Sequence, residues 1–250
     1  MLFPDYFEHL QALSELVGRW LRRHWRNGIA TFAGYDWGGR AACVAAALWP
    51  ERCAGLVSVN SHLIQDTFSA AMTPIRPELE AGFWFFYYFL TERGRAGLTA
   101  NRREIARVIW TRNSPKWRFD DATLERTALA FDNPDHVDVV SHSYRHRLGL
   151  APGYAPYQEL EERLTQQPVI PVPAITLDGL GDGTFPATEG AASAGHFTGP
   201  RVHHQVPDAG HNLPQEAPEA FADAVLDLAK LISRWVRSQI EPLCHHRLPG

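Results

Sequence analysis

Cysteine is scarce in this sequence, and it has neither a net basic charge nor a long apolar run. Its 250 residues include only 3 cysteines, Cys43, Cys53 and Cys244, and this odd, scattered set argues against a disulfide framework and fits a reducing cytoplasm. A formal net charge of −4 at pH 7 gives no electrostatic footprint for nucleic acid. No apolar run is long enough to cross a bilayer, and the N-terminal "MLFPDYFEHLQ" lacks the pattern of a secretion signal. We therefore expect a cytoplasmic protein that binds neither nucleic acid nor a membrane.

The first third of the sequence alternates between helical and strand patterns. Apolar residues recur at helical spacing from Pro4 to about Trp25, and "RNG" ends that pattern. A short apolar segment, "IATFA", then predicts a buried strand, and a helix of small residues follows it as far as Pro50. A second buried strand is predicted from Ala54 to Asn60. This alternation predicts a parallel sheet covered by helices.

The middle of the chain lacks strand signals. Residues 62–168 contain aromatic-rich helical segments such as "GFWFFYYFL" and "HVDVVSHSYRHRLGL". Strand character returns with "PAITL" and "RVHHQVP", and an amphipathic helix is predicted over "APEAFADAVLDLAKLISRWV". We predict an α/β fold in which residues 1–61 and 169–250 form the core and residues 62–168 form an inserted helical cap.

Three polar side chains follow predicted strands. Asp36 lies in "GYDWGGR", Asp182 lies in "GLGDGTFP", and His211 lies in "DAGHNLPQEAPE". Ligands bind at the carboxyl ends of strands in open α/β sheets, so these three segments are expected to meet. Gly34 and Gly38 are expected where the first strand and its helix approach closely.

Each of these residues also has a simpler interpretation when it is considered alone. Asp36 would serve as a helix N-cap, Asp182 as a turn residue and His211 as a loop histidine. Their order along the chain, nucleophile then acid then histidine, favours a catalytic triad. Asp178, in the same loop as Asp182, is the second candidate for the acid. The other position for an acid, after the second strand, holds Asn60.

Together the three motifs resemble the α/β-hydrolase superfamily over nearly the whole chain. An aspartate at the elbow resembles the epoxide hydrolase and haloalkane dehalogenase branch, although Tyr35 stands where that branch usually has histidine. The resemblance implies a mostly parallel sheet with flanking helices, and an alkyl ester formed on Asp36. His211, oriented by Asp182, would activate the water that hydrolyses this ester, and the backbone N–H of Trp37 would donate to the oxyanion. No cofactor and no metal is implied.

The resemblance also bears on the substrate. In the epoxide hydrolase branch two cap tyrosines polarise the epoxide oxygen, and Tyr144 in "HSYRHR" resembles one of them. Phe85 stands where the other is expected, with Tyr87 and Tyr88 just beyond it, although an aromatic run is also typical of a packed core. A haloalkane dehalogenase, with the indole N–H of Trp37 binding halide, is the alternative. Either way the expected partner is a small hydrophobic epoxide or haloalkane.

One motif of the family is missing from this sequence. Relatives carry a His-Gly-x-Pro loop that donates a second oxyanion N–H, and no His-Gly pair occurs here. The sheet is therefore expected to be incomplete on its N-terminal side, with "IATFA" at an exposed edge. A catalytically impaired or inactive truncated homologue is the remaining alternative.

Overall fold

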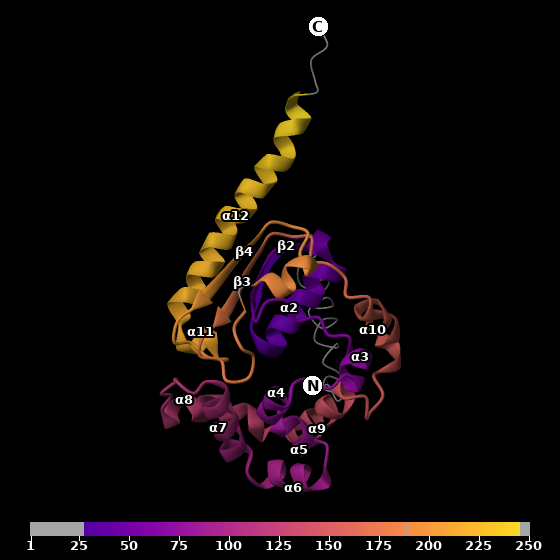
Figure 1. Ribbon diagram of the computed structural model, residues 1–250, viewed down its shortest axis with the longest axis vertical. Coiled ribbons are helices and arrows are strands. Elements are labelled where there is room, and N and C mark those ends of the chain that lie inside the picture. The colour runs from indigo at the N-terminus through magenta and orange to yellow at the C-terminus, as the bar shows by residue number, and fades with distance from the viewer. Residues whose placement is uncertain (1–27, 189, 246–250) are drawn as a thin grey trace.

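Four parallel strands form the sheet in the computed structural model, which describes residues 28–188 and 190–245 (Figure 1). The strands are β1 (Ala30–Gly34), β2 (Cys53–Val59), β3 (Ala174–Gly179) and β4 (Arg201–Val206), and they neighbour one another in chain order. Because all four run in one direction, the loops that follow them gather at one end of the sheet. The four predicted strands and the α/β class are confirmed. The helix predicted from Pro4 to Trp25 lies outside the described residues.

Two helices cover opposite faces of the sheet. Small residues let α2 (Asp36–Leu48) approach β1 and β2, while α12 (Pro218–His245) packs on β2 and β3. Successive side chains of a strand point to opposite faces, so Leu56 packs on the α2 side and Val57 on the α12 side. The central strands are therefore buried on both faces, as their unbroken apolar sequences predict. Beyond the sheet, α12 continues outward to His245, past the predicted helix end (Figure 1).

β1 is less buried than its apolar sequence predicts. Phe32 packs in the cluster under α2, but the alternate residues Thr31 and Ala33 are exposed. The reason is that α12 lies mainly over β2 and β3, so it leaves that face of β1 uncovered. Among the described strands β1 pairs with β2 alone, which places it at an edge, as expected.

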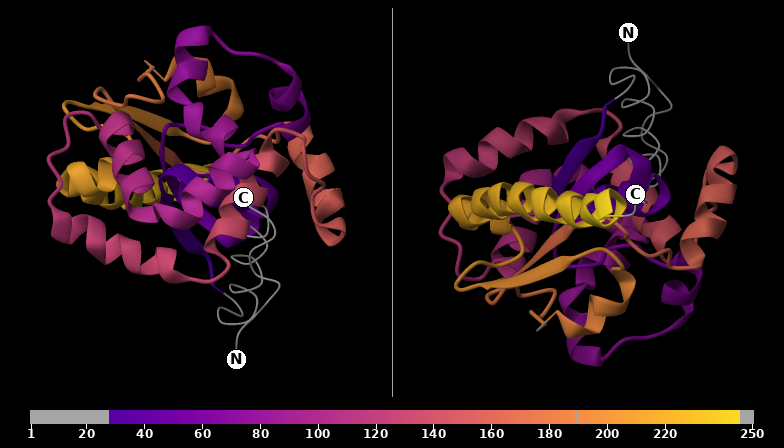
Figure 2. Two further views of the ribbon diagram at one scale, coloured as in Figure 1. Left: turned by 90° about the horizontal axis from the view of Figure 1, so that it is seen from below. Right: turned by 90° about the horizontal axis from the view of Figure 1, so that it is seen from above.

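All described regular structure between β2 and β3 is helical. These helices lie beyond the carboxyl ends of the strands, and they stand in front of the sheet when the molecule is seen from below (Figure 2). They are α3 (Thr67–Met72), α4 (Pro77–Gly82), α5 (Trp84–Phe89), α6 (Glu92–Ala100), α7 (Arg102–Asn113), α8 (Asp121–Ala128), α9 (His136–Arg147) and α10 (Gln158–Thr165). A short helix, α11 (Leu213–Glu216), follows β4, and 3-10 turns span Pro50–Arg52, Leu129–Asp132, Ala155–Tyr157 and Ala191–His196.

The helical region has a hydrophobic core of its own. Four phenylalanines of the segment around α5 pack with residues of α6 and α9; the buried members are Phe83, Phe85, Phe86, Phe89, Leu98 and Val137. Side-chain caps start several of the helices, as where Asp120 accepts from the backbone N–H of Thr123 at the start of α8. These helices fall within residues 62–168, and the exact division into core and cap stays a prediction. No helix of the described part is long and apolar enough to span a membrane.

Candidate active site

Asp36 occupies a strained turn between β1 and α2. Its φ is +48°, a left-handed conformation that costs free energy in a non-glycine residue and that recurs at functional sites. A Cβ on Gly34 would lie 2.6 Å from the backbone carbonyl of Gly38, so only glycine fits there. The expectation for Gly38 itself is wrong, because a Cβ there would meet nothing within 4 Å. The tight position is instead Gly39, whose Cβ would lie 2.7 Å from the side chain of Leu63 and 3.3 Å from the carbonyl oxygen of Gly34 at the end of β1.

The loops after β1, β3 and β4 bring the three predicted catalytic side chains together. Nδ1 of His211 lies 3.1 Å from Oδ2 of Asp182, and its Nε2 lies 3.9 Å from Oδ2 of Asp36. The His211 side chain is 9% exposed and that of Asp182 is fully buried. The imidazole therefore bridges a buried carboxylate and the carboxylate of the turn, with an ion-pair distance on one side and a hydrogen bond on the other.

Asp182 is held in place by four donors. Its Oδ1 accepts from the backbone N–H groups of Thr184 and Phe185, both at 2.8 Å. Its Oδ2 accepts from His211 and from the side-chain amide of Asn60 at 3.2 Å. These bonds stabilise the ionised carboxylate and fix its direction. The sequence marks Asn60 only as a position without an acid, yet its amide donates to the carboxylate of Asp182.

Asp178, the second candidate for the acid, lies within β3 rather than in the loop with Asp182, and its carboxylate binds other groups. Its buried carboxylate accepts from the backbone N–H of Thr188 at 2.8 Å and from the Thr188 hydroxyl at 3.1 Å. It also lies 3.8 Å from Nε2 of His203 on β4. No contact with His211 is formed, so the geometry favours Asp182.

The electrostatics of the site favour an ion pair between Asp36 and His211. Burial alone lowers the pKa of His211, but the hydrogen bond to Asp182 and the negative charges of Asp182 and Asp36 outweigh it and raise the pKa to about 10. Burial raises the pKa of Asp36, yet His211 and the cations Arg40 and Arg147 hold that pKa below its usual value. Asp36 therefore stays ionised at neutral pH, as a nucleophilic carboxylate must be.

A cavity of about 240 Å³ opens next to Asp36. Trp37, Phe85, Tyr144 and His211 are among its lining residues. The Tyr144 ring packs between phenylalanines of α5, with centroids 4.7 Å from Phe86. Its hydroxyl forms no hydrogen bond with any described residue. Burial raises the pKa of Tyr144 and so does the charge of Asp36, which keeps this hydroxyl protonated and able to donate.

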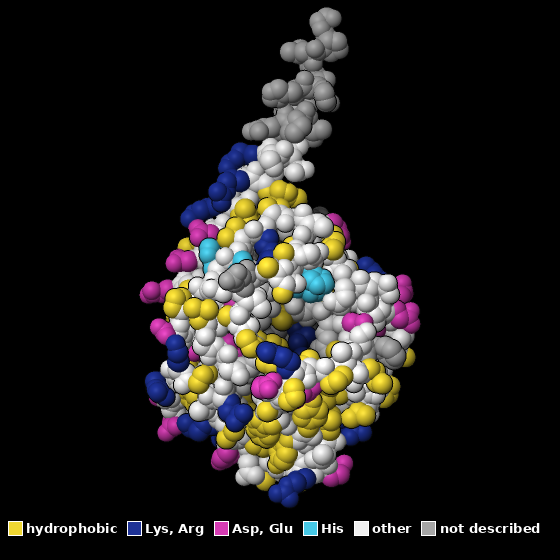
Figure 3. All heavy atoms as spheres, in the orientation of Figure 1, with side chains coloured by type: hydrophobic (Ala, Val, Ile, Leu, Met, Phe, Trp, Pro, Cys, Tyr) yellow, Lys and Arg dark blue, Asp and Glu magenta, His cyan; other side chains and the backbone are white. Residues whose placement is uncertain are grey.

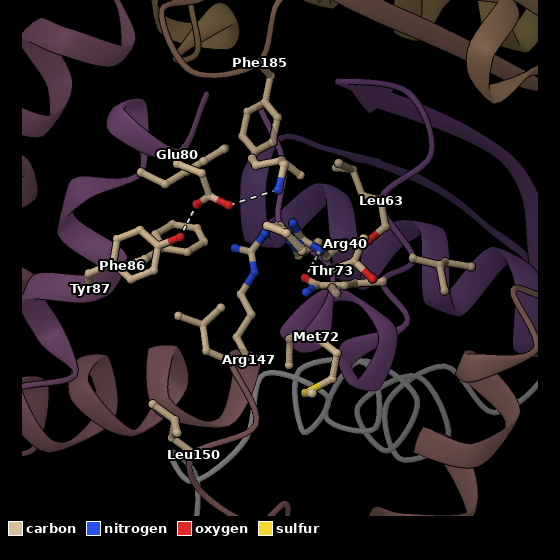
Figure 4. A pocket seen from close by; sticks show the side chains of 18 of the residues that line it. Arg40, Leu63, Met72, Thr73, Glu80, Phe86, Tyr87, Arg147, Leu150 and Phe185 are labelled. Carbon is tan, nitrogen blue, oxygen red and sulfur yellow. Dashed lines mark hydrogen bonds between the residues drawn. The ribbon is translucent and has the colours of Figure 1, made fainter. Parts of the chain in front are cut away.

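Of the three aromatic residues predicted for the substrate pocket, only Phe85 lies in the cavity with Asp36. Tyr87 lines a larger neighbouring pocket of about 750 Å³, where it is 45% exposed and donates to the carboxylate of Glu80 (Figure 4). Tyr88 lines neither space, because its ring packs beside Trp84 and over Gly97.

The end of α7 fastens both catalytic loops, a role that the sequence did not reveal. The backbone carbonyl of Asn113 accepts from the N–H of Gly183 at 2.9 Å and from the N–H of His211 at 3.2 Å. The buried hydroxyl of Ser114 accepts from the backbone and side-chain amides of Asn212, at 3.1 and 3.0 Å. The cap segment thus positions the residues next to the acid and the histidine.

Comparison with known proteins places this geometry in a family. The model of the alpha/beta hydrolase fold family matches residues 8–218. A crystal structure described as a "putative epoxide hydrolase", from Klebsiella pneumoniae subsp. pneumoniae, is 40% identical with a TM-score of 0.86, and the match covers 92% of this chain and 76% of that one. The chain belongs to the alpha/beta hydrolase fold family. No match was found among curated protein sequences.

More distant α/β hydrolases share the fold alone. A haloalkane dehalogenase variant from Bradyrhizobium elkanii, named DbeA-M1, is 16% identical with a TM-score of 0.67, and the match covers 92% of this chain and 77% of that one. A protein described as epoxide hydrolase CorEH is 14% identical with a TM-score of 0.68, with 91% and 76% covered. The family model and the 40% identical relative confirm the predicted superfamily, and the chain is a hydrolase of the α/β family. Among the described residues no group of three or more His, Cys, Asp or Glu side chains could hold a metal ion.

Proposed function

We propose that this α/β hydrolase opens an epoxide to a diol through a covalent ester on Asp36. The observation that carries the proposal is the line of groups from Asp36 through His211 to Asp182, with separations of 3.9 and 3.1 Å. A carboxylate attacks saturated carbon, whereas the serine of other hydrolases attacks carbonyl carbon. The 40% identical relative described as a "putative epoxide hydrolase" supports the same chemistry.

In the first step an Asp36 oxygen attacks one epoxide carbon, and the bond from that carbon to the ring oxygen breaks. The ring oxygen leaves as an alkoxide and takes the proton of the Tyr144 hydroxyl. Two features suit Tyr144 to this role: its position in the cavity beside Asp36, and the absence of a competing partner among the described residues. One donor replaces the usual two, because Phe85 has no proton to give.

The second step uses the charge lost in the first. Once Asp36 is an ester it no longer stabilises the imidazolium, so the pKa of His211 falls and the ring becomes a base at neutral pH. His211 then takes a proton from water, and the resulting hydroxide attacks the ester carbonyl. The first-turn N–H of Trp37 has no acceptor within its helix and would donate to the oxyanion. The proton that His211 loses as its pKa falls returns to the Tyr144 phenolate through solvent. Cleavage of the ester gives a carboxylic acid and an alkoxide, and transfer of the acid's proton to the alkoxide restores the Asp36 carboxylate and releases the diol.

A haloalkane dehalogenase is the second candidate, since Trp37 lines the same cavity and its indole N–H would bind halide. Halide leaves without needing a proton, however, so that reaction has no use for the Tyr144 hydroxyl. An inactive homologue is the remaining candidate, and the experiment below separates it from both enzymes.

The test is to trap the ester. His211→Ala protein is mixed with a reactive terminal epoxide, and the Asp36 peptide is examined by mass spectrometry. We expect the mass of one epoxide on Asp36, since attack does not need the histidine but hydrolysis does. The double variant Asp36→Asn/His211→Ala should show no adduct, because the nucleophile is gone. The variant His203→Ala, at a histidine outside the cavity, should show no lasting adduct, because His211 remains to support hydrolysis. Folded His211→Ala protein without an adduct would refute the proposal.

Tyr144→Phe separates the two chemistries. The loss of a proton donor should slow formation of the ester from an epoxide by about 10²–10⁴ and should leave attack on a haloalkane of similar size almost unchanged. An equal reduction in the rate of ester formation with both substrates would contradict the proposed role of Tyr144 as proton donor.

A further inference from the structure

Two arginines stand beside the proposed nucleophile, and the mechanism above uses neither as a proton donor. Arg147 is the last residue of α9, and Arg40 lies one helical turn after Asp36 on α2. Both line the 750 Å³ pocket, and Arg147 also lines the cavity that contains Asp36 (Figure 4). In the space-filling view, Lys or Arg side-chain atoms lie within the hollow at the middle of this face (Figure 3).

Both guanidinium groups pack against the same indole. The Cζ atom of Arg40 lies 5.1 Å from the Trp37 ring centroid, and that of Arg147 lies 5.4 Å from it. Arg147 also lies 4.5 Å from the ring centroid of Phe86. Aromatic contact accounts for where the Arg147 side chain sits, because guanidinium groups stack on rings. It leaves the N–H donors of that group without acceptors.

Hydrogen bonding differs sharply between the two arginines. Arg40 donates to the carbonyl of Leu63 at 3.1 Å and to the side chain of Gln65 at 3.2 Å, although its buried Nε has no partner. Arg147 forms no hydrogen bond and no ion pair with any residue of the described part. Burial and the neighbouring charge of Arg40 lower the pKa of Arg147 to about 9. The Arg147 side chain is only partly buried, so its donors remain accessible to a ligand from the pocket that it lines.

The nearby carboxylates do not supply that partner. Asp36 influences the pKa values of both arginines, but it is within ion-pair distance of His211 rather than of either arginine. Glu80, on the rim of the larger pocket, accepts from the Tyr87 hydroxyl and from a backbone N–H and makes no ion pair with either arginine. The pocket therefore presents an unpaired guanidinium with five donors in a planar fork.

We propose that the substrate carries a carboxylate, and that Arg147, with Arg40 beside it, binds this group in the larger pocket. This assignment of the ligand as substrate rests on the proposed function. The fork of an arginine matches a carboxylate with two parallel hydrogen bonds. Arg147 lines both spaces, as do Phe83, Phe86 and Phe185, so an apolar chain between the carboxylate and the reacting carbon would lie on these rings. The substrate class is then a hydrophobic epoxy acid rather than a neutral epoxide.

Binding of unreactive probes tests the subsite without any catalysis. We would measure the affinity of 4-phenylbutanoate and of its neutral amide by calorimetry. The carboxylate should bind the unsubstituted protein at least tenfold more tightly than the amide does. Arg147→Met should weaken carboxylate binding by about ten- to a hundredfold and leave amide binding unchanged, because only charge-assisted hydrogen bonds are lost. Arg147→Lys, which keeps the charge without the fork, should fall between the two.

Arg145→Met is the matched control. Arg145 lies two residues earlier on α9, donates to the carbonyl of Leu90 at 2.9 Å and lines neither space. The Arg145→Met variant should still bind the carboxylate more tightly than the amide. Equal affinity of acid and amide for the unsubstituted protein would overturn the subsite, as would an unchanged preference in folded Arg147→Met protein.

Alkylation separates this proposal from the proposed function. In the His211→Ala background, an epoxide with a terminal carboxylate should modify Asp36 at lower concentration than its amide does. If the carboxylate probe binds through Arg147 but neither epoxide modifies Asp36, the subsite stands and the epoxide hydrolase proposal fails. If both epoxides modify Asp36 equally well, the enzyme proposal stands and the subsite fails.

Discussion

Replacing Asp36 by asparagine should lower the pKa of His211 by about 3. The carboxylate oxygen lies 3.9 Å from Nε2 of the imidazole. Two unit charges at about that distance interact by about 4 kcal/mol at an effective dielectric constant of about 20, which suits a carboxylate whose side chain is 44% exposed toward a cavity. Since about 1.4 kcal/mol corresponds to one pKa unit, the pKa of His211 should fall from about 10 to about 7.

The variant also stands for the esterified enzyme, because asparagine and an ester are both uncharged. A pKa near neutrality in Asp36→Asn is therefore what the second chemical step requires. The assay is an NMR titration of the His211 ring resonances in the two proteins. Asp208→Asn, at an exposed carboxylate on the loop before His211, serves as the control and should leave the pKa unchanged. A fall of less than one unit in Asp36→Asn would refute the proposed activation of the base.

Three further predictions concern stability. Gly34→Ala should lower the melting temperature strongly or prevent folding, because its Cβ would lie 2.6 Å from the Gly38 carbonyl, whereas Gly38→Ala should be tolerated; similar melting curves would contradict this. Ser114→Ala should reduce the free energy of unfolding in urea by about 1–3 kcal/mol through its two lost hydrogen bonds, and exposed Ser233→Ala should not. The raised pKa of His211 contributes stability that is fully present below about 6.5 and lost as pH rises through about 10, so thermal stability should fall over that window and His211→Gln should flatten the fall.

The sequence predicted the sheet well because its strands are short apolar runs separated by helical patterns. β2 and β3 are buried on both faces, and such strands need no alternating pattern to be recognised. The outer face of β1 could not be foreseen, since the cover that α12 gives to β2 and β3 does not reach it. The choice between Gly38 and Gly39 depends on one side chain, Leu63, that arrives from a later loop.

The proximity of Asp36, Asp182 and His211 could be predicted because each follows a strand, and parallel strands place their carboxyl ends side by side. The hydrogen bonds that hold the catalytic loops could not be predicted, because they join segments far apart in the sequence. Ser114 and Asn212, for example, are 98 residues apart. Arg40 could have been noticed, since four residues after Asp36 is one helical turn. The proximity of Arg40 and Arg147 could be recognised only from the fold, because Arg147 comes from α9.

The Asn113 carbonyl, which accepts from both catalytic loops, also bears on how a substrate would reach Asp36. Moving the helical region away from the sheet at this end would break hydrogen bonds to Gly183 and His211. Such a movement would therefore disturb the loops that carry Asp182 and His211. The segment from Ala70 to Ile75 lines the larger pocket instead, and its Met72 is 74% exposed. For the proposed reaction we therefore expect the substrate to enter and the diol to leave beside this segment, and substitutions here should alter the rate of release more than the rates of the bond-making steps.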